Sequence, residues 1–371
     1  MERIPVARAD LSGNEETYVV EAIRSSWISS TGSFVSRFEG EFARECATSS
    51  ALSVCNGTVA LHLALLALGV RPGDEVLVPS LTYIATANAV RYVGAEPVFV
   101  DVDPATWTID PARIEDAITR RTRGIIAVHL YGHPADMDAI NHLAGVHGLW
   151  VVEDAAEAPM ARYKGRPTGG LGTIGTFSFY GNKILTSGEG GAVTFNDPGL
   201  GMRLRTLRGQ GMDPERRYYF PVTGYNFRLT NVACALLCAQ LERREAIVQR
   251  RAEIFARYSE GLVGVPGIGL QPVAPWAEPA LWLYSIIVDP DLYGRTRDEL
   301  MAHLDEHAIE TRPFFIPLHR LPPFREESTA RSEHLPVTDQ LSERGMNLPT
   351  FNTLNVESTD RIAGVIAAGR R

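Results

Sequence analysis

The residues best suited to chemistry lie in a glycine-rich stretch around one lysine, Lys183. A β-type run over residues 176–180 ends in a turn that holds this lysine, and the glycine-rich residues 188–191 follow before a second β-type run over residues 192–195. Glycine lets the backbone take positive φ and come close to a ligand, so the lysine is presented in a loop. Its amine could form a Schiff base with an aldehyde, as in pyridoxal phosphate enzymes. The alternative is a solvated lysine in a surface turn.

Two carboxylates follow an apolar run over residues 149–153. Asp154 comes directly after that run, and Glu157 lies about one turn further along the chain. A carboxylate in this place can pair with a protonated pyridine nitrogen and keep a cofactor ring an electron sink. Because burial alone opposes ionisation, such an acid needs a cationic partner. The alternative for Asp154 is a helix cap, and Glu157 could reach the hydroxyl side of the cofactor or the substrate.

An anion site is predicted where a strand ends and a helix begins at Gly57 and Thr58. Backbone amides at a helix N-terminus, with a glycine for close approach, suit a phosphate. A helix cap without any ligand is the alternative. The hydroxyl of Ser178 is fit to bind a phosphate too. Tyr83, just past another strand, could stack on a flat ring or belong to the core.

Two further motifs match known patterns in the wrong context. Residues 170–175 spell G-x-G-x-x-G, but a turn precedes them and a β-type run follows, where dinucleotide binding requires a strand before the motif and a helix after it. We therefore do not expect NAD. Residues 303–307 spell H-x-x-E-H on a predicted surface helix with no obvious third ligand, so no metal site is predicted.

The composition narrows the function classes. A chain of 371 residues with 45% hydrophobic and 22% charged residues is typical of a globular enzyme. The net charge of −8 argues against a nucleic-acid partner. We find no signal peptide and no apolar run of roughly 20 residues, so no membrane association is expected. Four cysteines in so long a chain favour reduced thiols and a cytoplasmic location.

Strands and helices alternate over most of the chain. After helices at residues 14–24 and 33–44, the predicted strands are 51–55, 75–79, 96–100, 123–130 and 149–153, separated by helices at 57–68, 83–93, 111–119 and 136–147. This alternation predicts an α/β fold with a mostly parallel sheet, whose ligands bind at the carboxyl ends of the strands.

The C-terminal third has a different pattern. A long helix over residues 231–261 would link a large domain (1–261) to a small α+β domain (262–371). In the small domain we expect strands near 281–288 and 309–312 and helices near 296–307 and 357–368.

Taken together, these motifs resemble the sugar aminotransferases of the DegT/DnrJ/EryC1/StrS family, a branch of the aspartate-aminotransferase fold (fold type I). The resemblance covers nearly the whole chain and rests on motifs that agree in order: Asn56-Gly57-Thr58, Gly73-Asp74-Glu75-Val76, Glu153-Asp154-Ala155, Phe177-Ser178-Phe179, Asn182-Lys183, Gly188-Glu189-Gly190-Gly191 and Gly224-Tyr225-Asn226-Phe227-Arg228.

The resemblance implies a role for each candidate. Lys183 would be the Schiff-base lysine and Asp154 the pyridinium partner of pyridoxal phosphate, with pyridoxamine phosphate as the form that carries the amino group. The other cofactor contacts would be Gly57, Thr58 and Ser178 at the phosphate, Tyr83 on the ring, Glu157 beside the 3-hydroxyl, and Asn226 at the phosphate bound by a neighbouring subunit. The last contact implies a homodimer with shared active sites.

Other motifs are similar to one branch of this family. Residues 180–183, 208–212, 310–315 and 317–319 resemble enzymes that aminate C4 of a GDP-linked 4-keto-6-deoxy sugar with glutamate, giving a perosamine-type product. Residues 185–189 are similar to keto-inositol aminotransferases, so that substrate and a dTDP- or UDP-linked 3- or 4-keto sugar stay open. Relatives that dehydrate sugars carry His at the lysine position, and Lys183 therefore favours amino transfer over a dehydratase.

A sugar diphosphate needs cationic neighbours, and guanidinium groups suit phosphate oxygens. The candidates are four arginines: Arg216, Arg217, Arg228 and Arg312. His319 could contact the sugar, and Trp27, in the polar loop between the first two helices, could form a lid over the substrate. The alternatives are solvated arginines and a tryptophan packed at the edge of the core.

Overall fold

A seven-stranded sheet forms the centre of the computed structural model, which describes residues 2–371. Its strands are β1 (Ser50–Val54), β2 (Glu75–Pro79), β3 (Glu96–Val100), β4 (Thr122–Val128), β5 (Trp150–Asp154), β8 (Ile174–Ser178) and β9 (Gly191–Phe195). In the order β1-β9-β8-β5-β4-β2-β3, the pairs from β8 to β3 are parallel, and β9 is antiparallel to β1 and β8. The prediction of a mostly parallel sheet is confirmed.

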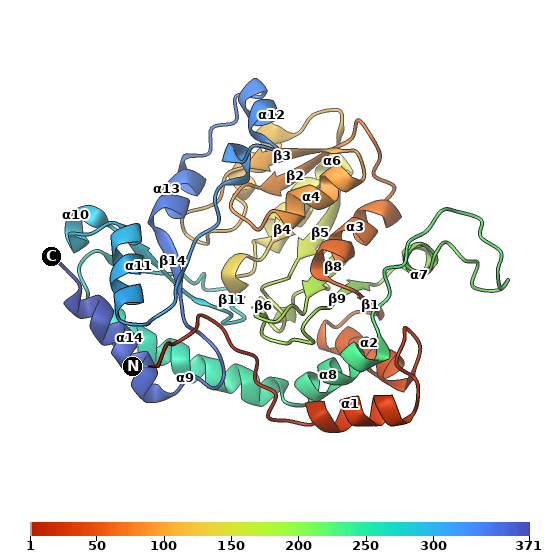
Figure 1. Cartoon of the computed structure of the whole chain (residues 1–371). Helices are drawn as coiled ribbons and strands as arrows, with labels where there is room; N and C mark the ends of the chain where they lie inside the picture. The colour runs from red at the N-terminus through yellow and green to blue at the C-terminus, as the bar shows by residue number, and fades with distance from the viewer. Residues whose placement is uncertain (1) are drawn as a thin grey trace.

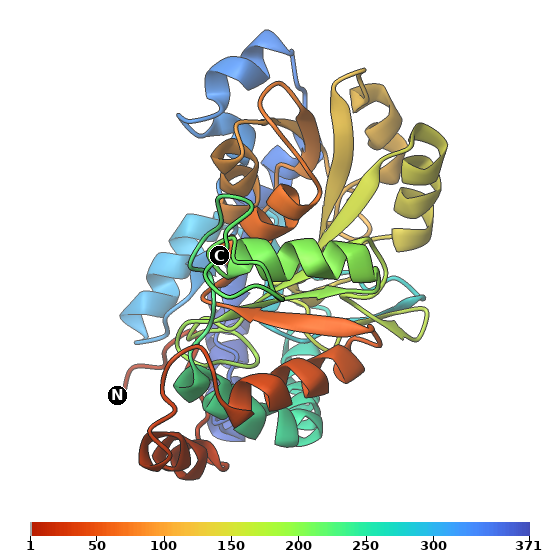
Figure 2. The same ribbon diagram turned by 90° about the vertical axis from the view of Figure 1, so that its right-hand side faces the viewer.

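Both faces of this sheet are buried under helices (Figures 1 and 2). In β2, Val76 and Val78 enter one apolar cluster and Leu77 enters the other, as the alternation of side chains along a strand requires. The helices that follow the first strands are α3 (Gly57–Ala67), α4 (Ala85–Tyr92) and α6 (Met137–His147), and α1 (Glu15–Arg24), α2 (Ser33–Glu45) and α7 (Pro198–Arg208) complete the layers.

Two predicted helices differ from the structure. The helix expected over residues 111–119 is the short α5 (Pro111–Ile114) followed by a 3-10 turn, Glu115–Ala117. The single helix expected over residues 231–261 is two helices, α8 (Asn231–Glu242) and α9 (Arg244–Leu262). They separate at Arg243, whose φ of −101° and ψ of 5° are not helical. The break lets α8 pack on α1 and α2 while α9 packs on a C-terminal helix, α14 (Val356–Ala368).

A four-stranded antiparallel sheet forms the C-terminal part, in the order β10-β12-β14-β13. Its strands are β10 (Ile268–Leu270), β12 (Tyr284–Val288), β13 (Arg312–Pro313) and β14 (Gly345–Leu348), and it is flanked by α10 (Pro290–Tyr293), α11 (Arg297–Glu306) and α14. The short strand β14 and the helices α12 (Arg325–Ala330) and α13 (Pro336–Arg344) had no counterpart among the predicted elements. A third, small sheet joins β6 (Arg162–Tyr163), β7 (Arg166–Pro167) and β11 (Ala277–Glu278).

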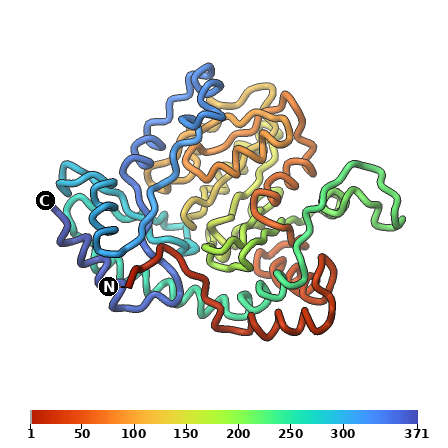
Figure 3. The backbone as a smooth tube through the Cα atoms, in the orientation of Figure 1, coloured from red at the N-terminus to blue at the C-terminus, as the bar shows by residue number. Residues whose placement is uncertain are grey.

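Each of these two parts receives a segment from the other part of the chain. The N-terminal segment runs beside the C-terminal part of the chain (Figure 3). Ile4 pairs with Ile309 and joins the apolar core of the small sheet. In the other direction, Phe324 and Leu335 pack against Phe99 of β3. The Asp101 carboxylate accepts hydrogen bonds from the first amides of α13. The division into residues 1–261 and 262–371 stays a prediction.

Residues 209–226 form an arm that leaves the body of the molecule (Figure 1). The backbones of Gly209 and Asn226 pair at its base. Near its tip, Tyr218 is 73% exposed and Phe220 is 51% exposed. Among the helices of the described residues, none combines the length and the apolar content that a transmembrane segment requires.

Candidate active site

Lys183 is held in a tight turn that follows β8, where its amide donates to the Tyr180 carbonyl. The side chain is only 12% exposed, so the alternative of a solvated surface lysine is wrong. Its Nζ lies 3.7 Å from Glu157 Oε1 and 4.0 Å from the centre of the Trp282 ring. Burial lowers the pKa of the amine, and the carboxylates of Glu157 and Asp154 oppose that shift.

Asp154 ends β5 and is fully enclosed. Its Oδ2 accepts from Thr86 Oγ1 at 2.7 Å and its Oδ1 accepts from the Ala156 amide at 3.2 Å. The residues that follow form a turn, so the helix-cap alternative is wrong. Burial raises the pKa of Asp154, because the hydrogen bonds and the more distant cations do not fully offset desolvation. The site therefore favours a further cationic partner for this carboxylate.

Glu157 lies in the turn after Asp154 and faces Lys183. Its Oε2 accepts from the Tyr131 amide at 2.8 Å. Tyr131 has φ of 49°, in the left-handed region that non-glycine residues seldom adopt. This conformation directs the amide at the carboxylate. Burial raises the pKa of Glu157 to about 7, against the attraction of the Lys183 charge.

Glu153, next to Asp154, has a structural task that the sequence did not reveal. Three amides of the glycine-rich loop, those of Gly169, Leu171 and Gly172, donate to its carboxylate at 2.7 Å each. His129 Nδ1 accepts from the Ala135 amide, so the ring proton lies on Nε2 and is donated to Glu153 at 3.1 Å. The amides of the G-x-G-x-x-G loop thus bind a buried side chain, and β8 follows instead of a helix.

The residues of the predicted phosphate site lie at the start of α3 and beside it. Asn56 caps this helix by accepting from the Val59 amide at 2.9 Å. The amides of Gly57 and Thr58 have no acceptor in the part of the chain that the structure describes. A Cβ on Gly57 would lie 2.7 Å from that of Ser178, so glycine is required for the close approach of these two predicted phosphate ligands.

The predicted substrate-binding residues lie outside the cluster of Lys183, Asp154 and Glu157. Arg312 lies on β13, near enough for its charge to lower the pKa of Lys183. Arg228 pairs with Val54 of β1, and its Nε is buried with no hydrogen-bond partner among residues 2–371. His319 Nδ1 lies 2.8 Å from Ser80 Oγ, just past β2, and its Nε2 lies 3.3 Å from Asp339. Burial lowers the pKa of this histidine.

Three predicted contacts are exposed in the single chain. Tyr83 is 58% exposed, with its ring centre 5.8 Å from that of Phe315. Trp27 is also 58% exposed, and its carbonyl accepts from Asn231. Asn226 is exposed at the base of the arm. The roles assigned to these three residues stay predictions.

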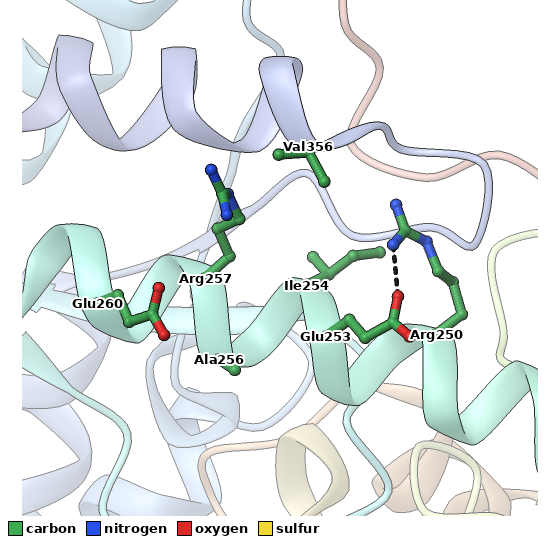
Figure 4. Close-up of a pocket in the computed structure, with 7 residues that line it drawn as sticks. All are labelled: Arg250, Glu253, Ile254, Ala256, Arg257, Glu260 and Val356. Atoms are coloured by element: carbon green, nitrogen blue, oxygen red, sulfur yellow. Dashed lines mark hydrogen bonds and ion pairs between the residues drawn. The ribbon is translucent and has the colours of Figure 1, made fainter.

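Sequence reasoning missed Thr86, Tyr131 and Trp282. Each contacts Lys183 or one of its acidic neighbours, but each comes from a different part of the chain and belongs to no motif. A groove of about 310 Å³ lies elsewhere, between α9 and α14 (Figure 4). There Arg250 is paired with Glu253, and Arg257 is paired with Asp360.

Comparison with known proteins identifies the family. Residues 9–367 match the DegT/DnrJ/EryC1/StrS aminotransferase family. The chain is 46% identical to GDP-perosamine synthase of Caulobacter vibrioides, over 98% of this chain and 97% of the relative. It is 44% identical to GDP-perosamine synthase of Escherichia coli O157:H7, over 96% of each chain. The crystal structure of DesV from Streptomyces venezuelae, in complex with a ketimine intermediate, superposes with a TM-score of 0.92 and 38% identity over 99% of this chain and 98% of DesV.

Proposed function

The chain belongs to the DegT/DnrJ/EryC1/StrS aminotransferase family, and we propose that it moves an amino group from glutamate to C4 of a GDP-linked 4-keto-6-deoxy sugar. The observation that carries this proposal is the similarity to GDP-perosamine synthases over nearly the full length of both chains. A dTDP-linked sugar is the second candidate, because a transaminase of a dTDP-linked aminosugar is 43% identical over 84% of this chain.

The enzyme is a pyridoxal phosphate-dependent aminotransferase, and the residues present fit that cofactor. Asp154 is a buried carboxylate with no ion pair among residues 2–371, and a protonated pyridine nitrogen would supply the missing cation. The unpaired amides of Gly57 and Thr58 suit the phosphate, beside Ser178. When bound, pyridoxal phosphate would supply the aldehyde carbon that takes up and returns nitrogen and a ring that delocalises charge from the α-carbon.

Lys183 is the general base and acid of both half-reactions. Once its amine is free, burial favours the neutral form, which can take the proton from the α-carbon of glutamate. Glu157, 3.7 Å away, keeps that amine oriented and limits the fall in its pKa. Asp154 would keep the ring nitrogen of the bound cofactor protonated. The same groups act in reverse order at the keto carbon of the sugar.

Two arginines are available for anionic parts of the substrates. Arg228 has a buried Nε with no partner among the described residues, which supports a contact with phosphate oxygens. Arg312 lies close enough for its charge to lower the pKa of Lys183, and it would bind either the glutamate carboxylate or the sugar diphosphate. His319, whose ring is held by Ser80 and Asp339, would contact the sugar.

The active form would be a homodimer. The arm over residues 209–226 exposes Tyr218, Tyr219, Phe220 and Val222, and an apolar surface of this kind favours a protein partner. Asn226 at its base would then reach the cofactor phosphate bound by the other subunit. The exposed ring of Tyr83 would be covered by the cofactor on which it stacks. Each of the four cysteines is a free thiol, which supports the reducing cytoplasm as the location.

One experiment tests the reaction and the substrate together. The purified protein, loaded with pyridoxal phosphate, is mixed with glutamate, and the change of cofactor absorbance reports the first half-reaction. The enzyme, now in its pyridoxamine phosphate form, is then mixed separately with GDP-4-keto-6-deoxymannose, a dTDP-4-keto-6-deoxy sugar and a keto-inositol. We expect the GDP sugar to restore the original spectrum fastest and to gain an amine at C4. Preference for another substrate by a factor of ten or more contradicts the assignment.

A further inference from the structure

The side chain of Trp282 contacts both Lys183 and the residue that precedes it, Asn182. The residue is 4% exposed, on the segment that leads into β12. Its indole Nε1 donates to the carbonyl of Asn182 at 2.8 Å. The centre of its ring lies 4.0 Å from Lys183 Nζ. One side chain therefore fixes the backbone just before the lysine and also contacts the reacting amine.

Trp282 is itself held by a buried arginine. Arg251, from the middle of α9, donates through Nη1 to the carbonyl of Trp282 at 2.7 Å and to that of Leu281 at 3.3 Å. Leu281 has φ of 51°, in the left-handed region, so the turn needs such support. Burial lowers the pKa of Arg251 to about 10, and the two carbonyls are its hydrogen-bond acceptors.

The segment before Trp282 is also bonded to the segment that carries Tyr131. The Ala280 amide donates to the carbonyl of Gly132 at 3.0 Å. The Tyr131 ring lies nearly parallel to that of Trp282, with centres 6.5 Å apart. The amide of Tyr131 is the donor to Glu157. The Lys183 amine thus faces the ring of Trp282 and the carboxylate of Glu157. The backbone segment before Trp282 is hydrogen-bonded to the segment whose amide binds Glu157.

We propose that Trp282 is a positioning residue for Lys183: its ring face binds the ammonium, and its N–H fixes the turn that carries the lysine. The face of an indole attracts a cation within about 6 Å, and more strongly when water is excluded. This inference rests on the proposed role of Lys183 in amino transfer. It predicts that the ring keeps the amine near the acids whenever the amine is protonated.

The attraction has a measurable consequence. Binding of the ammonium by the ring favours the charged form of Lys183, in the opposite direction to burial. Without the ring, we expect the pKa of Lys183 in the cofactor-free protein to fall by about one unit, from the size of a desolvated cation–π contact. If the Trp282 ring only excluded water, its loss would instead raise the pKa of Lys183, because water that entered would hydrate the ammonium.

The chain is well suited to this measurement because it contains just two lysines, Lys164 and Lys183. The cofactor-free protein is reductively methylated with ¹³C-formaldehyde, and the lysine resonances are titrated by NMR. A Lys164→Arg variant assigns them. Lys164 is an internal reference, since it is about half exposed and bonded to Asp138 at 2.7 Å.

Three variants separate the contributions. Trp282→Leu keeps an apolar side chain without a ring face, and should lower the pKa of Lys183 by about one unit. Trp282→Phe keeps a ring but not the N–H, and should leave the pKa within about 0.3 units while the glutamate half-reaction slows by about tenfold. Trp150→Leu, at the far end of β5, is the matched control and should change neither quantity.

The outcomes are decisive in both directions. An unchanged or raised pKa of Lys183 in Trp282→Leu overturns the proposal, as does an equal fall in Trp150→Leu. If Trp282→Phe carries out the glutamate half-reaction at the wild-type rate, the indole N–H has no positioning role. The titration uses no substrate, so failure of the wild-type protein to aminate a GDP sugar counts against the proposed function alone.

Discussion

The pair formed by Glu157 and Lys183 makes the stability of the cofactor-free protein depend on pH. The pKa of Glu157 is raised by burial from an ordinary 4.5 to about 7. Between these values the unfolded chain releases its proton while the folded protein retains it, so rising pH favours unfolding. Each pKa unit corresponds to about 1.36 kcal/mol. Ionising this buried carboxyl therefore costs about 3 kcal/mol in total, of which about 2.5 kcal/mol falls between pH 5 and pH 8.

Replacing Glu157 by Gln removes that cost and leaves an oxygen to accept from the Tyr131 amide. We expect the free energy of unfolding of Glu157→Gln, relative to the wild type, to rise by about 2.5 kcal/mol between pH 5 and pH 8. Urea denaturation of both cofactor-free proteins at the two pH values measures it. Glu245→Gln, at a side chain that is 90% exposed, is the control. A difference between wild type and Glu157→Gln that is constant with pH would refute the reasoning.

Other parts of the site give further expected outcomes. Asp154→Asn removes the anion beside the ring nitrogen, and the glutamate half-reaction should slow by about a hundredfold or more in stopped-flow absorbance; a normal rate contradicts that pairing. Gly57→Ala would place a Cβ 2.7 Å from that of Ser178, so spectral titration should show a higher Kd for pyridoxal phosphate; an equal Kd excludes the phosphate site. Glu153→Gln leaves buried N–H donors unpaired and should lower the free energy of unfolding, measured in urea, by about 3 kcal/mol. A variant of unchanged stability that loses activity would show that Glu153 has a catalytic role instead.

The first half of the fold could be predicted because its signals are local. Each buried parallel strand up to residue 154 is a short apolar run, and each following helix has its own polar and apolar faces. The site residues Lys183, Asp154 and Gly57 could be chosen for the same reason, since they stand at the ends of strands. The structure places Lys183 and Asp154 in one buried cluster.

What could not be predicted depends on contacts between distant residues. The break at Arg243 follows from α8 and α9 packing on different partners, and an apolar period that runs through residue 243 gives no sign of it. Glu153 binds a loop about sixteen residues further on, so its sequence context looks like that of a second catalytic acid. Trp282 is one of five tryptophans, and only the fold brings it within 4.0 Å of Lys183.

The central claim is that pyridoxal phosphate is bound covalently to Lys183, and borohydride reduction tests it most directly. The reduced protein is digested, and the peptides that carry its two lysines are compared by mass spectrometry. We expect the phosphopyridoxyl group on the Lys183 peptide at close to one per chain and none on the Lys164 peptide. A colourless protein with no added mass at Lys183, or a label on Lys164 alone, would contradict the account.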